Sequence, residues 1–360
     1  MDRTFRSIHP KFKWKGISMR YHDLDEVSYS LIKEGQPYQK VLGEFLLDWI
    51  DKKNTIVLKT SGSSGIPKNI RVEKQYMVNS ALATGSYFDL RPGQAALLCL
   101  PGNYIAGKMM LVRAMVLGLE LDWVAPSMNP LRTMDYCYDF CAMVPMQLEN
   151  SLDQIDKIKT LIVGGTPMSD SLREKVQDKK VNVFETYGMT ETLSHIAVRK
   201  VNHGATDYFE TLPNVKIHSD ERDCLVIKAP EISKEPIYTN DIVELQSDQR
   251  FKWLGRYDNI INSGGVKLIP EQIEGKLATL LKKRFFIVGL PDKKLGQKVA
   301  LLIESQHKDT GLLEKIKTLE TIKKYEIPKD IVCIERFVET GNGKISRPET
   351  LLLLQNGKDI

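Results

Sequence analysis

At its centre the chain reads Val181-Asn182-Val183-Phe184-Glu185-Thr186-Tyr187-Gly188-Met189-Thr190-Glu191, an apolar strand followed directly by a polar turn. In an open α/β sheet such a turn lies at the carboxyl edge, where ligands bind. Here it offers the Thr190 hydroxyl to a phosphate, the Glu191 carboxylate to Mg²⁺ and the flat Tyr187 ring to adenine or an acyl group. Taken alone, a tight turn with a capping threonine and a solvated glutamate explains these residues better.

Around this stretch, from about residue 54 to residue 198, short apolar runs alternate with amphipathic segments. This alternation is typical of parallel strands joined by crossover helices. The expected strands are residues 55–58, 95–100, 121–124, 140–144, 160–163 and 181–185. The expected helices include residues 74–87, 107–118 and 169–176, the last with Ser169 as its N-cap. This part of the chain is therefore predicted to be α/β with a mainly parallel sheet.

The pattern changes after residue 198. Apolar residues recur with period two at 215–218, 224–228, 242–245 and 251–254, which predicts an antiparallel β subdomain over about residues 199–254. Beyond it we expect a helix from Pro270, strands near 285–288 and 299–303, a lysine-rich helix near 312–324 and a strand at 331–337. About 100 residues suffice for a small α+β domain. Two domains are predicted, residues 1–254 and residues 255–360.

Composition restricts the function classes. The 360 residues are 42% hydrophobic and 27% charged, and the net charge of +5 is dispersed, which argues against a dedicated nucleic-acid surface. The odd number of cysteines, five, suits reduced thiols in the cytoplasm, and Cys137 and Cys141 lack a second pair that would suggest zinc. No signal-type apolar segment and no run of about 18 apolar residues is present, so we expect neither secretion nor membrane insertion.

A second polar segment, Thr60-Ser61-Gly62-Ser63-Ser64-Gly65-Ile66-Pro67-Lys68, follows the first expected strand. Its hydroxyls, backbone N–H groups and lysine can converge on phosphate oxygens. A Walker A loop is excluded, because Pro67 precedes Lys68 and Asn69 follows it. By itself such a segment is as often a flexible turn as a phosphate loop.

Lys344 lies in a similar segment near the other end, Gly341-Asn342-Gly343-Lys344-Ile345-Ser346-Arg347. Joining a carboxylate to the α-phosphorus of ATP brings two anions together, and one ammonium group between them stabilises the transition state. No general base is required, because a carboxylate is already nucleophilic. An isolated lysine in a glycine-rich loop would more often be merely exposed, so the assignment depends on the order of all the motifs.

In that order, these segments resemble the adenylate-forming superfamily of acyl-CoA synthetases, luciferases and peptide-synthetase adenylation domains. The resemblance covers about residues 54–347 and implies an N-terminal domain that binds ATP and acid and a mobile C-terminal domain that carries the catalytic lysine. It implies catalytic roles for Lys344, Thr190 and Glu191, with Glu191 also holding Mg²⁺. The residues implied in ATP or AMP binding are Thr60, Ser61, Gly62, Ser63, Ser64, Gly65, Lys68, Gly164, Gly165, Thr166, Tyr187, Asp241 and Arg256.

The same resemblance assigns a ribose site, a hinge and a thiol channel. Asp241, in Tyr238-Thr239-Asn240-Asp241, would accept hydrogen bonds from both ribose hydroxyls, and Arg256 would donate to the same region. Asp258 would be the hinge about which the small domain turns. That turn would withdraw Lys344 and present a channel for the CoA arm, formed by Ser263, Gly264 and Gly265. As alternatives, Asp241 could cap a turn and Arg256 could form a surface pair.

Two departures from the family pattern concern the acid site. The chain is well over 100 residues shorter than a typical member, so its N-terminal subdomain is expected to be abbreviated. Tyr104, in Pro101-Gly102-Asn103-Tyr104-Ile105-Ala106-Gly107, stands where relatives commonly have histidine. The predicted acid pocket consists of Tyr104, Gly188, Ser194 and His195. His195 could equally be a strand residue with an ordinary partner.

The stretches at residues 190–197 and 260–265 look most like those of o-succinylbenzoate–CoA ligases of menaquinone biosynthesis. We therefore expect a cytoplasmic ligase that forms an acyl-adenylate from Mg-ATP and a carboxylic acid and transfers the acyl group to CoA. Its expected partners are ATP, Mg²⁺, CoA and a small-molecule acid, without nucleic acid. The alternatives are adenylation of another acid, loading of a carrier protein, and a catalytically silent adenylate-binding protein.

Overall fold

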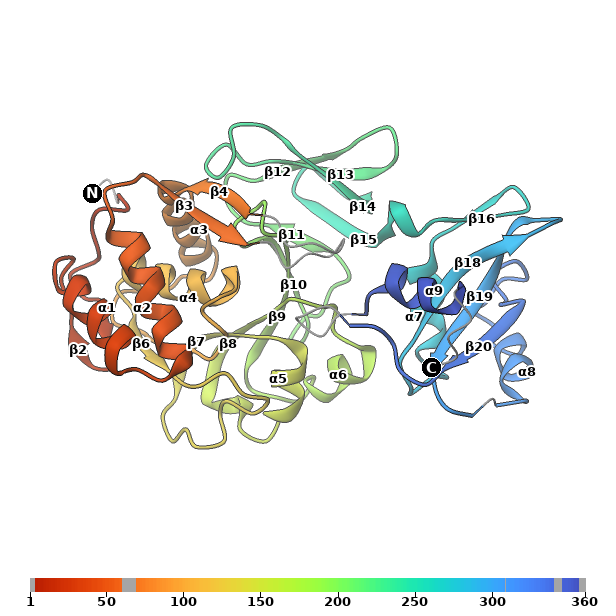
Figure 1. The fold of residues 1–360 in the computed structure, drawn as a ribbon, viewed down its shortest axis with the longest axis horizontal. Coiled ribbons are helices and arrows are strands. Elements are labelled where there is room, and N and C mark those ends of the chain that lie inside the picture. Colours follow the sequence, from red (N-terminus) through yellow and green to blue (C-terminus); the bar gives the residue numbers. More distant parts are fainter. Residues whose placement is uncertain (1–3, 60–68, 308, 340–344, 356–360) are drawn as a thin grey trace.

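The computed structural model describes residues 4–59, 69–307, 309–339 and 345–355. Within these ranges, thirteen strands form a large sheet in the order β12-β13-β14-β15-β11-β10-β9-β8-β7-β5-β6-β1-β2. Five more form a smaller sheet near the C-terminus, and two pair separately. Figure 1 shows the smaller sheet beside the large one, built from the blue, C-terminal part of the chain.

The centre of the large sheet is parallel, as predicted. Neighbouring strands β6, β5, β7, β8 and β9 all pair in parallel. They span Ala95–Leu98 (β5), Glu120–Trp123 (β6), Tyr138–Met143 (β7), Ile158–Val163 (β8) and Asn182–Gly188 (β9). Alternate residues enter two apolar cores, one on each face, as in β7, where Phe140 enters one core and Cys141 the other.

Helices cover both faces of this parallel region. They are α3 (Lys74–Tyr87), α4 (Ile105–Leu117), α5 (Pro145–Asn150) and α6 (Asp170–Lys175), with a 3-10 turn, η1, at Ile155–Lys157. The predicted N-cap of α6 is confirmed, because the Ser169 hydroxyl accepts a hydrogen bond from the Leu172 N–H at 3.2 Å. The predicted crossover helices are therefore present.

The N-terminal contribution to the large sheet is short. It consists of β1 (Lys13–Trp14) and β2 (Ile17–Ser18), which are followed in the chain by the helices α1 (Asp23–Glu34) and α2 (Pro37–Ile50). Strand β1 pairs in parallel with β6, and β2 pairs antiparallel with β1 at the outer rim. The turn between them places Lys15 and Gly16 at positive φ, 48° and 78°. Two two-residue strands thus form this side of the sheet.

One predicted strand belongs elsewhere. We expected residues 55–58 to join the parallel sheet, but β3 (Thr55–Lys59) pairs antiparallel with β4 (Asn69–Glu73) in a separate two-stranded sheet. The apolar composition of the segment indicated a strand correctly, but it carried no information about the partner. The phosphate-loop candidates between β3 and β4, residues 60–68, lie outside the described residues.

The antiparallel strands are also present, with one difference in their placement. They are β10 (His195–Lys200), β11 (Phe209–Thr211), β12 (Lys216–Ser219), β13 (Cys224–Lys228), β14 (Ile237–Leu245) and β15 (Arg250–Arg256). Because β10 pairs antiparallel with β9, these strands continue the large sheet instead of forming one of their own. The last parallel strand is therefore hydrogen-bonded to the first antiparallel one.

The smaller sheet follows a 3-10 turn, η2 (Tyr257–Asn259). Its strands are β16 (Ile261–Ser263), β17 (Val266–Leu268), β18 (Phe285–Asp292), β19 (Gly296–Glu304) and β20 (Asp330–Ile334). Its helices are α7 (Pro270–Leu277), α8 (Leu312–Lys317) and α9 (Arg347–Gln355). Helix α8 is shorter than the predicted 312–324, because the chain turns after Lys317 and packs Leu319 and Ile322 against the small core. Among the described residues, no helix is long and apolar enough to cross a membrane.

Candidate active site

The carboxyl ends of β8 and β9 lie side by side, which brings two predicted segments together. Gly164 follows β8, and a Cβ atom there would lie 2.2 Å from the Thr186 hydroxyl oxygen on β9. That hydroxyl donates a hydrogen bond to the Val163 carbonyl at 3.2 Å. Gly165 has a φ of 93°, and half-buried Thr166 follows it. Glycine is therefore required for the close approach of the two strand ends.

Tyr187, Asp241 and Arg256 also meet, although they come from β9, β14 and β15. The Tyr187 hydroxyl donates to Asp241 Oδ2 at 2.6 Å, and a guanidinium nitrogen of Arg256 lies 3.5 Å from Asp241 Oδ1. The indole N–H of Trp253 donates to the same Oδ1 at 3.1 Å. Burial and the adjacent Asp241 carboxylate raise the pKa of Tyr187 well above its usual range. This carboxylate is held in place by three neighbours from two strands.

The predicted hinge lies next to this group. Asp258 belongs to η2, and its carboxylate accepts hydrogen bonds from the Asn240 amide at 3.1 and 3.2 Å. It also accepts one from Arg256 at 3.2 Å. Arg256 thus bridges Asp241 in the large sheet and Asp258 in the connection to the smaller one.

The turn after β9 is fixed by Thr192. Its hydroxyl accepts a hydrogen bond from the Met189 N–H at 2.9 Å and donates to the Ser194 carbonyl at 2.7 Å. Thr190 is half-buried and Glu191 is exposed. Among the described residues, no group of three histidine, cysteine or acidic side chains could hold a metal. One exposed carboxylate nevertheless suits Mg²⁺, which commonly keeps several waters and takes its remaining ligands from substrate phosphates.

Ser194 and His195 surround a residue that the sequence analysis missed, Arg113. Its side chain is buried at 1% exposure in the middle of α4. Its guanidinium donates to the Thr84 hydroxyl at 3.3 Å and to the Ser194 hydroxyl, and lies 3.3 Å from His195 Nδ1. Among the described residues, no carboxylate lies within ion-pair distance of it. We call Thr84, Arg113, Ser194 and His195 the polar cluster.

Burial affects both titratable members of the polar cluster. Burial lowers the pKa of Arg113 to about 9. Burial, with a further contribution from Arg113, lowers the pKa of His195 well below its usual value. His195 is therefore neutral at physiological pH, and the cluster carries one positive charge. An anion would be the natural complement to this charge.

A usable signal for Arg113 was present in the sequence. Arg113 is the one charged residue within Met109-Met110-Leu111-Val112-Arg113-Ala114-Met115-Val116-Leu117, an otherwise apolar stretch. Charged residues are rarely fully buried unless they are paired, so an arginine on an all-round apolar helix predicts a ligand or a partner.

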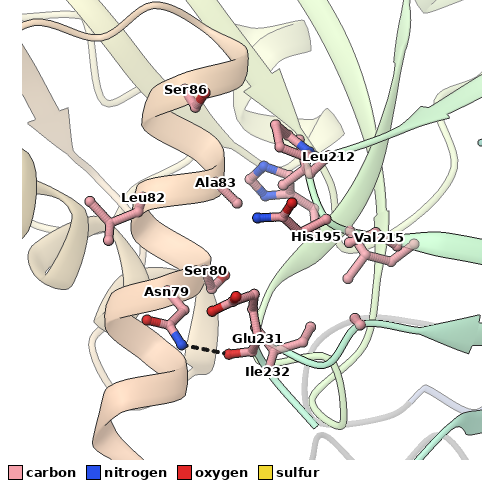
Figure 2. Close-up of a pocket in the computed structure, with 14 residues that line it drawn as sticks. Asn79, Ser80, Leu82, Ala83, Ser86, His195, Leu212, Val215, Glu231 and Ile232 are labelled. Carbon is pink, nitrogen blue, oxygen red and sulfur yellow. Dashed lines mark hydrogen bonds between the residues drawn. The ribbon is translucent and has the colours of Figure 1, made fainter.

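A cavity of about 250 Å³ lies next to the polar cluster, and His195 lines it. Figure 2 shows α3 on one side, contributing Asn79, Ser80 and Ala83, and His195 on the other. The amide of Asn79 donates to the carbonyl of Glu231, another residue that lines the cavity, at 2.8 Å. The remaining wall comes from the segments around Leu212 and Ile232, so this cavity adjoins the carboxyl edge of the sheet but does not coincide with it.

The remaining predicted residues lie on other elements or outside the described ranges. Tyr104 is half-buried and is the N-cap residue of α4, the helix that carries Arg113. Ser263 ends β16, and Gly264 and Gly265 form the turn into β17. Strand β16 lies on the side of the smaller sheet remote from β9 (Figure 1). Lys344 and the predicted phosphate-loop residues lie outside the described residues, namely Thr60, Ser61, Gly62, Ser63, Ser64, Gly65 and Lys68.

Comparisons with known proteins agree with this architecture. A family model described as AMP-binding enzyme matches residues 18–220. A 2-succinylbenzoate–CoA ligase from Listeria monocytogenes is 24% identical, over 92% of this chain and 74% of the relative. The corresponding enzyme of Escherichia coli K12 is 25% identical, over 86% and 71%.

Two solved structures share the fold. An acyl-CoA synthetase (AMP-forming)/AMP-acid ligase II-like protein from Dyadobacter fermentans is 37% identical with a TM-score of 0.61, covering 92% of this chain and 98% of that one. The o-succinylbenzoate coenzyme A synthetase of Bacillus subtilis, in complex with ATP and magnesium ion, is 21% identical with a TM-score of 0.70. The latter match covers 82% of this chain and 69% of that one.

Proposed function

Because this chain belongs to the AMP-binding enzyme family and is an adenylate-forming acid–CoA ligase, we propose that the acid it activates is o-succinylbenzoate. The curated relatives named for this acid align over most of the chain, at 24–25% identity. Identity at this level supports the reaction class more strongly than the substrate. The choice of acid therefore depends on the chemistry of the site.

The observation that carries the proposal is the charge of the polar cluster. o-Succinylbenzoate has two carboxylates, and only one of them is converted to the acyl-adenylate. The other remains an anion and must leave water when the acid binds, which is costly unless a cation meets it. Arg113 is a buried cation without a carboxylate partner among the described residues, and Ser194 adds a hydroxyl beside it. A ring carboxylate would complete this cluster.

The first half-reaction follows from the residues assigned to ATP. One carboxylate oxygen of the acid attacks the α-phosphorus, the bond to the bridging oxygen breaks, and pyrophosphate leaves. We assign Thr190 to the α-phosphate, and Asp241 with Arg256 to the ribose. Lys344 would lie between the two approaching anions. Bound Mg²⁺ would neutralise phosphate charge, and Glu191 is the residue assigned to hold it.

The second half-reaction transfers the acyl group. The CoA sulfur attacks the acyl-adenylate carbonyl and forms the C–S bond, and the thiol proton passes to solvent. The bond between the carbonyl carbon and the phosphate oxygen breaks, and AMP leaves with that electron pair. No protein nucleophile takes part, so the cysteines have no assigned role. We assign Ser263, Gly264 and Gly265 to the pantetheine arm and Asp258 to the hinge whose rotation brings them to the site.

A matched pair of acids tests the substrate. ATP–pyrophosphate exchange is measured with o-succinylbenzoate and with benzoylpropionate, which has the same skeleton without the ring carboxylate. We expect exchange with the diacid to be at least about 100-fold more efficient, as for loss of a buried charge-assisted pair. Equal rates with the two acids would refute the assignment of Arg113. If the enzyme catalyses exchange but transfers the acyl group to a carrier protein and not to free CoA, the acceptor is a carrier protein.

A further inference from the structure

The junction between the two sheets contains a carboxylate with no assigned role, Glu271. It lies in the first turn of α7 and packs against the end of β15. A Cβ atom added at Gly255 would lie 2.4 Å from Glu271 Oε2 and 2.4 Å from the Ile269 side chain. Only a residue without a side chain lets α7 lie this close to β15. Gly255 is thus a point at which the large sheet packs against helix α7 of the smaller unit.

Glu271 connects three separate segments. Its Oε1 accepts a hydrogen bond from the Asn259 amide at 2.5 Å and lies 3.6 Å from an Arg347 nitrogen. Its side chain is 9% exposed, and within the described residues Oε2 is buried with no hydrogen-bond partner. An unsatisfied buried oxygen disfavours the arrangement that contains it. Such a group calls for an explanation from its surroundings.

Arg347 also makes a second pair, which stays within the smaller unit. Its guanidinium lies 2.8 Å from Glu274 Oε2, and Glu274 Oε1 accepts a hydrogen bond from the Ile287 N–H at 2.7 Å. These residues belong to α9, α7 and β18, so this pair would move with the unit. The contact of Glu271 with Gly255, in contrast, joins the unit to the large sheet. Arg347 follows Lys344 by three residues in the sequence.

The arrangement of the two units indicates which half-reaction the contact with Gly255 would serve. In Figure 1 helix α9 lies on the side of the smaller unit that faces the large sheet, whereas strand β16 lies on the remote side. Helix α9, which begins at Arg347, therefore lies nearer the large sheet than β16, which ends at Ser263, one of the residues assigned to CoA. This is the arrangement required for acyl-adenylate formation.

On the basis of the proposed function, we infer that Glu271 is a positioning residue for the adenylation half-reaction. Through Gly255, Asn259 and Arg347 it sets the smaller unit against the large sheet. When the unit turns for thioester formation, the contact with Gly255 separates and the Arg347–Glu274 pair persists. Glu271 touches neither substrate nor reacting atoms, so its influence should be confined to one of the two half-reactions.

Measuring the half-reactions separately tests this inference. In the full-length chain, Gly255→Ala and Glu271→Ala should lower ATP–pyrophosphate exchange by about tenfold, a typical coupling between two states. Thioester formation from supplied acyl-adenylate and CoA should stay within about twofold of the parent. A parallel loss in both half-reactions, or a selective loss of thioester formation, would overturn the inference. Thermal unfolding of each variant identifies losses that come from misfolding, and Glu271→Ala keeps the test valid if Gly255→Ala fails to fold.

Glu274→Gln is the matched control, because it alters the Arg347 pair that moves with the unit. It should change both half-reactions by the same factor, and a selective loss of exchange would overturn the special role of Glu271. The ratio of the two rates can be measured with any acid that the parent enzyme activates. If the parent accepts a different acid from o-succinylbenzoate, the substrate proposal fails while the Glu271 test can still be completed.

Discussion

Two buried arginine sites flank the β9–β10 pair, and they differ in charge balance. Around Glu185, Arg199 donates through Nε at 2.9 Å, Arg173 donates as well, and the Met168 N–H donates at 3.0 Å. That carboxylate has 5% side-chain exposure and two cationic partners. Arg113, more deeply buried at 1% exposure, has hydroxyl and imidazole partners but no carboxylate among the described residues.

The contrast separates a structural ion cluster from a binding site. In the Glu185 cluster the two guanidinium groups are balanced by two carboxylates, Glu185 and Asp170, the latter 3.9 Å from Arg173. This cluster therefore needs no ligand. The polar cluster of Thr84, Arg113, Ser194 and His195 carries an uncompensated charge that burial makes costly. A buried charge of this kind is typical of a binding site, because an anionic substrate can supply the negative counter-charge that the protein does not.

The largest expected effect tests the polar cluster, which we propose to bind the substrate. Arg113→Met should lower kcat/KM for o-succinylbenzoate by about 1000-fold, equivalent to about 4 kcal/mol of lost transition-state binding. Activity with benzoylpropionate should change little, and the free energy of unfolding should not fall, because an unpaired buried charge is removed. Steady-state kinetics with both acids and urea unfolding measure these quantities.

Arg199→Met is the matched control from the other cluster. It should lower the free energy of unfolding and leave the ratio of the two acids unchanged. If Arg113→Met instead destabilised the fold and preserved that ratio, the two clusters would be of the same kind.

The second effect concerns stability. Glu185→Gln removes the carboxylate shared by Arg173 and Arg199 and leaves Arg173 only the more distant Asp170, at 3.9 Å. Breaking a buried pair in this way costs about 3 kcal/mol. Urea unfolding would measure the loss, while the discrimination between the two acids should persist. Glu149→Gln removes the partner of Lys175 in an exposed pair and should cost less than about 1 kcal/mol. A similar cost for both variants would contradict the contrast in burial.

The third effect is a pH dependence of stability. The folded state holds the pKa of His195 well below the unfolded value, so the unfolded state takes up the proton first as pH falls. Stability from this group is therefore present above about pH 6.5 and declines below it, by up to about 1.4 kcal/mol per pH unit. In urea titrations at pH 7.5, 6.5 and 5.5, His195→Asn should reduce the loss at low pH. His218→Asn controls for the removal of a histidine, and an unchanged pH dependence in His195→Asn would count against the neutral state.

The smallest effect is a refinement of the polar cluster. Thr84→Val removes the hydroxyl that accepts from Arg113 at 3.3 Å and nearly preserves side-chain shape. It should raise KM for o-succinylbenzoate several-fold, in line with about 1 kcal/mol for one hydrogen bond. Thr211→Val removes a comparable buried hydrogen bond, to the Val215 carbonyl at 3.0 Å, and should leave KM unchanged. Equal KM values for both variants would remove Thr84 from the site.

Sequence reasoning identified the strands and edge turns well because period and turn chemistry are local properties. Tyr187 and Asp241 were each selected from their own motifs, and the structure joins them by a hydrogen bond of 2.6 Å. Partner choice is not local, which is why β3 was assigned to the wrong sheet. Arg113 was missed for the same reason, because its meaning depends on Ser194 and His195, about eighty residues away.

The rim of the large sheet has a consequence for the behaviour of the protein in concentrated solution. An exposed edge strand is a template on which another chain can add, and long flat edges promote aggregation. Here the rim ends in β2, two residues long, after a turn with positive φ at Lys15 and Gly16. So few free backbone groups on this border give an incoming strand little to pair with, and the short β2 thereby protects this border against intermolecular β-pairing.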